Sequence, residues 1–78
     1  MSNEETYIKN EIKDRNIKAG YPIFSDKIDS VYMNETGNSS DHLTNAYNNM
    51  VNKGELTRDY DKDDYILTQK GHIAIFGN

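Results

Sequence analysis

The sequence predicts a single α+β domain over residues 1–78, in which three helices, a short strand, a two-stranded hairpin and a short final helix are combined. Three observations support this fold class. Apolar residues recur at the helical spacing of i, i+3 and i+4 in three stretches of the chain. Two short β-prone runs flank a charged loop near the C-terminus. Finally, a chain of 78 residues is long enough for one hydrophobic core but not for two.

The first helix is predicted from Asn3 to Asn16. Ile8 and Ile12 are four residues apart, so they lie on the same helix face and are expected to point inward. Ser2 and Glu5 have the spacing of a capping box, in which each side chain accepts a hydrogen bond from a free backbone N–H. These features together predict an amphipathic helix with a well-defined start.

A short extended segment and a second helix are expected next. Gly20 allows the turn that follows the first helix, and Pro22 favours an extended conformation for Tyr21–Phe24. Ser25 is the expected N-cap of a helix that runs from about Asp26 to Asn34. The apolar face of this helix consists of Ile28, Val31 and Tyr32.

The third helix has the most regular pattern in the chain. It is expected to begin with Ser39 or Ser40 as its cap and to end at Lys53, because Gly54 supplies a typical stop. Its apolar face consists of Leu43, Ala46, Tyr47, Met50 and Val51. Its opposite, polar face consists of Asp41, His42, Asn45, Asn48, Asn49 and Asn52.

A hairpin and a last helix complete the prediction. The strands are Glu55–Arg58 and Tyr65–Thr68, joined by the charged loop of residues 59–64. Thr68 is then the expected N-cap of a helix over Gln69–Phe76, which Gly71 weakens. The residues expected to point into the core are Leu56, Tyr65 and Leu67 in the hairpin and Ile73, Ile75 and Phe76 in the helix.

The segment NNMVNKGELTRD…DDYILTQKG resembles one that is shared by PadR-like and MarR-like regulators and by small viral winged-helix proteins. The matching residues are Lys53, Gly54, Leu56, Tyr65, Leu67, Thr68, Lys70 and Gly71. The resemblance implies a winged helix-turn-helix fold in which the third helix enters the major groove of DNA and the hairpin forms the wing. It is closest over about 30 residues, and the order of elements extends it to the whole chain.

The resemblance makes a small DNA-binding regulator of transcription the first functional hypothesis, with double-stranded DNA as the partner. Asparagine amides on the third helix have the donor and acceptor groups that recognise adenine in the major groove. The candidate nucleic-acid-binding residues are His42, Thr44, Asn45, Asn48, Asn49, Asn52, Lys53 and Arg58. A thin core also makes a homodimer attractive.

The charge distribution supports a second hypothesis, a module that binds a basic protein surface. The net charge is −4, and the loop of residues 59–64 has four Asp against one Lys, which gives −3. Such a loop repels phosphates but can imitate them, as in an anti-CRISPR-like inhibitor of a host nucleic-acid enzyme encoded by a phage or mobile element. The candidate residues are Asp59, Tyr60, Asp61, Asp63 and Asp64. The simplest alternative is a solvated hairpin tip.

Other classes of protein are poorly supported. There is no cysteine, no apolar run long enough to span a membrane and no signal peptide, so a cytoplasmic location is expected. Asp59, Asp61 and Asp63 have the spacing that opens an EF-hand loop, but Asp64 and Lys70 replace its required Gly and Glu. Because no catalytic arrangement is recognisable, we expect no enzymatic activity, no bound metal and no cofactor.

Overall fold

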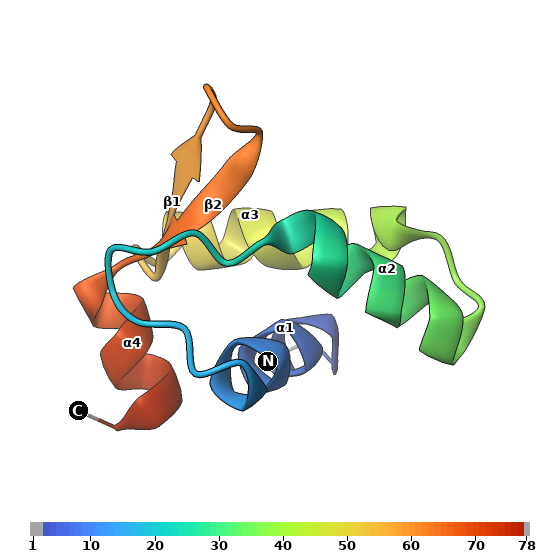
Figure 1. The fold of residues 1–78 in the computed structure, drawn as a ribbon, viewed down its shortest axis with the longest axis horizontal. Coiled ribbons are helices and arrows are strands. Elements are labelled where there is room, and N and C mark those ends of the chain that lie inside the picture. Colours follow the sequence, from blue (N-terminus) through green and yellow to red (C-terminus); the bar gives the residue numbers. More distant parts are fainter. Residues whose placement is uncertain (1–2, 78) are drawn as a thin grey trace.

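The computed structural model describes residues 3–77 as an α+β fold of four α-helices, one 3₁₀ turn and a two-stranded antiparallel sheet (Figure 1). The elements are α1 (Asn3–Asp14), α2 (Ser25–Thr36), η1 (Ser40–Leu43), α3 (Thr44–Asn52), β1 (Leu56–Asp59), β2 (Asp64–Leu67) and α4 (Gln69–Phe76). The hairpin projects away from the helices beside α3, whereas α1 and α4 lie on the other side of α3 (Figure 1). Within residues 3–77, every helix is too short or too polar to cross a membrane.

Helix α1 follows the prediction closely. Ile8 and Ile12 are completely buried, and Glu5 is buried as well. The helix ends at Asp14, two residues earlier than predicted, and Asn16 takes a left-handed conformation with φ 54°. Asparagine tolerates this region better than most residues, so it can turn the chain without glycine. The predicted capping partner Ser2 lies outside the described residues.

The extended segment after α1 lies along β2, on the side opposite β1. The backbone N–H of Gly20 donates to the Leu67 carbonyl at 2.7 Å, and the N–H of Leu67 donates to the Tyr21 carbonyl at 3.0 Å. Pro22 faces Ile66 in an antiparallel bridge, where its missing N–H leaves no bond unmade. The predicted extended conformation is therefore confirmed up to Ile23, where the segment pairs with β2, but it is wrong for Phe24, which is left-handed.

The prediction that Ser25 is the N-cap of α2 is wrong. Ser25 is the first helical residue, and Phe24 holds the cap position in a left-handed conformation with φ 58° and ψ 59°. Asp64 supplies the cap, because its Oδ2 and Oδ1 accept hydrogen bonds from the N–H groups of Phe24 at 3.1 Å and Ser25 at 3.0 Å. Helix α2 continues to Thr36, two residues past the prediction, and Gly37 ends it with φ 73°.

The predicted third helix is divided into two parts. Residues 40–43 form the 3₁₀ turn η1, which Ser39 caps by accepting a hydrogen bond from the Asp41 N–H at 3.2 Å. Helix α3 follows directly. Gly54, just beyond it, has φ 78° and prevents the helix from continuing, as predicted. The predicted apolar residues Leu43, Ala46, Tyr47 and Met50 are buried, and Val51 is half-buried.

The hairpin and α4 meet at a glycine. Strands β1 and β2 pair with Leu56 opposite Leu67. Both strands lie one residue closer to the hairpin loop than predicted. Thr68 caps α4 as predicted, since its Oγ1 accepts a hydrogen bond from the Gly71 N–H at 2.9 Å. A Cβ atom at Gly71 would lie only 2.0 Å from the Glu55 carbonyl oxygen. Gly71 therefore allows α4 to approach the start of β1.

The orientation of α4 corrects one prediction about the core. Ile73 is 49 % exposed, although it was expected to point inward. Gly71 is the buried residue of α4 and marks the face that points to the core. Ile75 lies on this face because it is four residues after Gly71, whereas Ile73 is rotated by roughly 200° from it and points to solvent. Ile75 and Phe76 pack partly against the core, as predicted. The buried core consists of Ile8, Ile12, Ile17, Ile23, Ile28, Tyr32, Leu43, Ala46, Tyr47, Met50, Leu56 and Leu67.

Candidate functional site

The polar face of η1 and α3 is fully accessible. Apart from Asp41, its exposed side chains are those predicted as base-reading residues: His42, Thr44, Asn45, Asn48, Asn49 and Asn52. They are exposed because the buried residues of α3 occupy the other side of the helix at i, i+3 and i+4 spacing. Within residues 3–77, the four asparagine side chains make no hydrogen bond to the rest of the protein. Their amides are thus available to a ligand.

Lys53, at the C-terminal end of this face, is engaged in a network of charges. Its ammonium group hydrogen-bonds to the Glu5 carboxylate and lies 3.7 Å from Oε1 of Glu55. Lys9 approaches the same Glu55 oxygen at 3.5 Å. Glu5 and Glu55 are both buried, and the hydrogen bond to Glu5 raises the pKa of Lys53. The positive charge of Lys53 therefore already serves two buried carboxylates.

Arg58 is held within the hairpin. Its guanidinium group donates to the Asp63 carboxylate and, at 2.8 Å, to the backbone carbonyl of Asp64. It also lies 4.9 Å from the ring centre of Tyr65 and 5.4 Å from that of Tyr60. The hydrogen bond to Asp63 raises the pKa of Arg58. Lys53 and Arg58, the lysine and arginine of the predicted DNA-binding set, are thus both paired with carboxylates of the same chain.

The acidic residues of the hairpin do not form one surface. Tyr60 is 84 % exposed at the tip, with exposed Asp61 and Asp63 on its C-terminal side. Asp59 is half-buried and its Oδ1 accepts the Asp61 N–H at 3.2 Å, which stabilises the turn. Asp64 is only 9 % exposed because it caps α2, so it is not part of the exposed tip.

A groove that the sequence did not indicate lies beside the asparagine face. It has a volume of about 300 Å³ and is formed by residues of α2, η1, α3 and the hairpin. Four of its lining residues are carboxylates, Asp26, Asp29, Asp41 and Asp63, and one is a cation, Arg58. The two aspartates of α2 have no distinctive sequence signal, because acidic residues near a helix N-terminus usually only complement the helix dipole.

Aromatic residues are packed together within the lining of this groove. Tyr47 stacks on Tyr65 with ring centres 4.8 Å apart, and its hydroxyl donates to Oδ1 of Asp29 at 3.0 Å. Burial raises the pKa of Asp29 and outweighs the opposite effect of the Tyr47 hydroxyl. Burial and the neighbouring Asp29 carboxylate also raise the pKa of Tyr47. The groove therefore combines stacked aromatic rings with a surplus of carboxylates.

The described residues contain no group of three His, Asp or Glu side chains that is arranged to hold a metal ion. The chain matches no model of a protein family, and comparisons with curated proteins and with solved structures give no significant match.

Proposed function

We propose that this chain is a small winged helix-turn-helix protein that binds duplex DNA through α3 and regulates transcription, with the β1–β2 hairpin as its wing. The order of elements and the hairpin directly after α3 support this assignment. The observation that carries it is the row of unengaged amides on the exposed face of α3: Asn45, Asn48, Asn49 and Asn52. Such amides match the donor and acceptor pattern of adenine in the major groove.

The charges next to α3 determine how tightly such a protein binds. Lys53 and Arg58 are paired with carboxylates, and the adjacent groove adds further negative charge. Phosphate contacts supply most of the salt-dependent affinity for DNA, so we expect a monomer to bind weakly and only at low salt. A homodimer would double the number of contacts by placing two copies of α3 on successive half-sites.

A titration of labelled duplex DNA at low and moderate salt, combined with amide shift mapping, tests the proposal. The backbone amides of Asn45, Asn48 and Asn49 are expected to shift, and affinity should fall as salt rises. Replacing both Asn48 and Asn49 by Ala should weaken binding about tenfold or more. The matched control is Asn10→Ala on the exposed face of α1, which should bind like the wild type. Absence of binding at the lowest salt would overturn the proposal.

The acidic groove favours a second candidate function, the binding of a basic protein segment. Its four carboxylates and the exposed tip residues Tyr60 and Asp61 offer a surface that matches lysine and arginine side chains. Such a surface would suit an inhibitor that imitates nucleic-acid phosphates.

One double variant separates the two candidates because it changes charge but not shape. Replacing Asp41 and Asp61 by Asn removes two exposed negative charges beside α3 and at the hairpin tip. Duplex binding should become tighter in this variant, since repulsion of phosphates is reduced. Binding of a polylysine or polyarginine peptide should become weaker. Peptide binding that is unaffected by the double variant would contradict the second candidate.

A further inference from the structure

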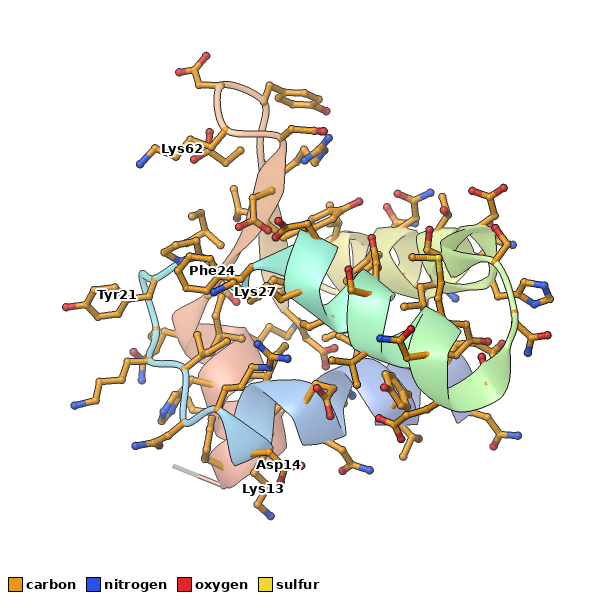
Figure 2. The ribbon with its side chains drawn as sticks, turned by 45° about the vertical axis from the view of Figure 1, so that its right-hand side comes forward. Lys13, Asp14, Tyr21, Phe24, Lys27 and Lys62 are labelled. Atoms are coloured by element: carbon orange, nitrogen blue, oxygen red, sulfur yellow. The ribbon has the colours of Figure 1, made fainter. Side chains whose placement is uncertain are left out.

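A patch of aromatic and basic residues lies around the extended segment between α1 and α2. Tyr21 is 60 % exposed and Phe24 is 47 % exposed, both large fractions for aromatic side chains in a small protein. Figure 2 shows Tyr21 extending away from the body of the protein, and Phe24 and Lys27 close to one another. We refer to Arg15, Lys18, Tyr21, Phe24 and Lys27 as the aromatic-basic patch.

The patch surrounds a hollow whose lining, within residues 3–77, has no carboxylate side chain. The hollow has a volume of about 520 Å³, and its lining consists of Arg15, Asn16, Ile17, Lys18, Tyr21, Pro22 and Phe24. Arg15, which follows α1 directly, forms an ion pair with Glu11 of that helix at 3.3 Å. Lys18 has no carboxylate partner among residues 3–77. On a chain with a net charge of −4, the hollow is thus a site where cations outnumber carboxylates among the described lining residues.

The backbone holds the Phe24 ring at the surface. Phe24 has a left-handed conformation, φ 58° and ψ 59°, which is unfavourable for a residue with a bulky side chain. The buried Asp64 carboxylate maintains it by accepting hydrogen bonds from the N–H groups of Phe24 and Ser25. Lys27 Nζ lies 5.4 Å from the centre of the Phe24 ring, so a cation and an aromatic face are presented together. Backbone strain of this kind tends to occur at functional sites.

From this geometry we propose that the aromatic-basic patch binds single-stranded nucleic acid. Unpaired bases stack on exposed aromatic rings, and cations beside the rings neutralise the phosphates. A duplex does not fit this arrangement, because its bases are already stacked and paired inside the helix. Beyond Phe24 the surface becomes acidic, with Asp26 and Asp63 in the adjacent hollow, so the strand is expected to run from Phe24 toward Lys18 and Arg15. Lys62 of the hairpin lies at that acidic boundary (Figure 2).

The proposal is tested by fluorescence anisotropy with a labelled oligothymidylate of about 12 nucleotides, a length that spans a typical single-strand site. The wild type should bind, and the slope of log affinity against log salt should be about −0.7 for each phosphate that is contacted. Tyr21→Ala and Phe24→Asn should each weaken binding about tenfold. Asn is chosen for position 24 because it adopts the left-handed conformation readily, so the α2 cap is preserved. Lys18→Gln should make the salt slope shallower by about 0.7.

The matched control is Tyr60→Ala, which removes another highly exposed aromatic ring at the hairpin tip and should not change oligothymidylate binding. The proposal is independent of α3, so the Asn48→Ala, Asn49→Ala double variant should bind duplex DNA more weakly and bind the single strand like the wild type. Absence of oligothymidylate binding at low salt would overturn the proposal. Equal displacement by polyglutamate would also overturn it, because the patch would then recognise an acidic protein segment.

Discussion

Residues of the same type have different roles in the hairpin, and burial decides which role each one has. Asp61 and Asp64 belong to one acidic run in the sequence, yet Asp61 is exposed at the tip and Asp64 is only 9 % exposed. A buried carboxylate is stable only when hydrogen bonds replace its lost water. Asp64 has such bonds from the first two N–H groups at the start of α2. Its charge therefore stabilises the fold and is not available to a partner.

Replacing Asp64 by Ala tests this role. The change leaves the N–H groups of Phe24 and Ser25 without their acceptor and removes a favourable charge at the start of α2. We expect the free energy of unfolding to fall by about 2 kcal/mol, as measured by urea denaturation. Asp61→Ala, made in the same run at the tip, should change it by less than about 0.5 kcal/mol. Equal effects of the two substitutions would contradict the capping role.

Gly71 illustrates the same dependence on tertiary contacts. A methyl group there would lie 2.0 Å from the Glu55 carbonyl oxygen and 2.9 Å from Cδ1 of Leu67. Although alanine has the higher helix propensity, Gly71→Ala should destabilise the protein by about 3 kcal/mol because α4 must move away from β1. Thermal unfolding measures the loss. Ala74→Ser, on the exposed side of α4, is the control and should change stability by less than about 0.5 kcal/mol.

At the scale of elements, periodic patterns were the reliable guide. The inward positions of α1 and α3 and the Thr68 cap of α4 followed from spacing and local chemistry, because these depend on residues close in sequence. The split of the third helix and the Asp64 cap of α2 could not be predicted in this way. The Asp64 contact joins residues about 40 positions apart, and no local pattern encodes such a contact. The exposed asparagine face was placed correctly because it is the complement of the apolar face.

The network of charges around Glu5 joins α1 to the turn between α3 and β1. Lys9 and Glu5 lie on α1, Lys53 follows α3, and Glu55 precedes β1. Two buried carboxylates in this position require nearby cations, since an unpaired buried charge is costly. The sequence did not reveal this arrangement, because Lys53 equally suited the end of a helix. The network links α1 to the turn between α3 and the hairpin.

Removing the Lys53 side chain should therefore destabilise the folded protein. We expect Lys53→Ala to lower the free energy of unfolding by about 1–2 kcal/mol, because the buried Glu5 carboxylate loses its ion pair with the Lys53 ammonium group. This is less than the roughly 3–5 kcal/mol for a fully buried pair, since the Lys53 side chain is 42 % exposed and water screens part of the charge. Lys62→Ala is the matched control in the exposed hairpin tip. A similar loss in both variants would show that Lys53 is not specifically required.

At the scale of the whole molecule, charges of opposite sign are concentrated on different surfaces. The groove beside α3 is lined by four aspartates and Arg58, whereas the described lining of the hollow beside Tyr21 has Arg15 and Lys18 and no carboxylate side chain. The net charge alone disfavours any nucleic-acid partner, but it conceals this separation. The separation could not be derived from the sequence, because the aspartates come from α2, η1 and the hairpin. The folded chain therefore has two surfaces of different charge.

The acidic groove also predicts how stability depends on pH. Burial raises the pKa of Asp29 above its ordinary value of 3.8, so the folded state holds this proton more strongly than the unfolded state does. The contribution of Asp29 to stability therefore decreases as pH rises from below 3.8 through its pKa in the folded protein. At neutral pH the carboxylate is charged within the groove, close to other aspartates.

Asp29→Asn should accordingly stabilise the protein at neutral pH by up to about 0.5 kcal/mol. The amide oxygen can still accept the hydrogen bond from the Tyr47 hydroxyl, while the charge is removed. Thermal unfolding at a series of pH values should show the difference at pH 7 and its disappearance well below 3.8, where the wild-type carboxyl is neutral too. Asp61→Asn at the exposed tip controls for a general effect of net charge. If Asp29→Asn were destabilising at pH 7, the Tyr47 hydroxyl would require a charged acceptor, and the raised pKa of Asp29 would be refuted.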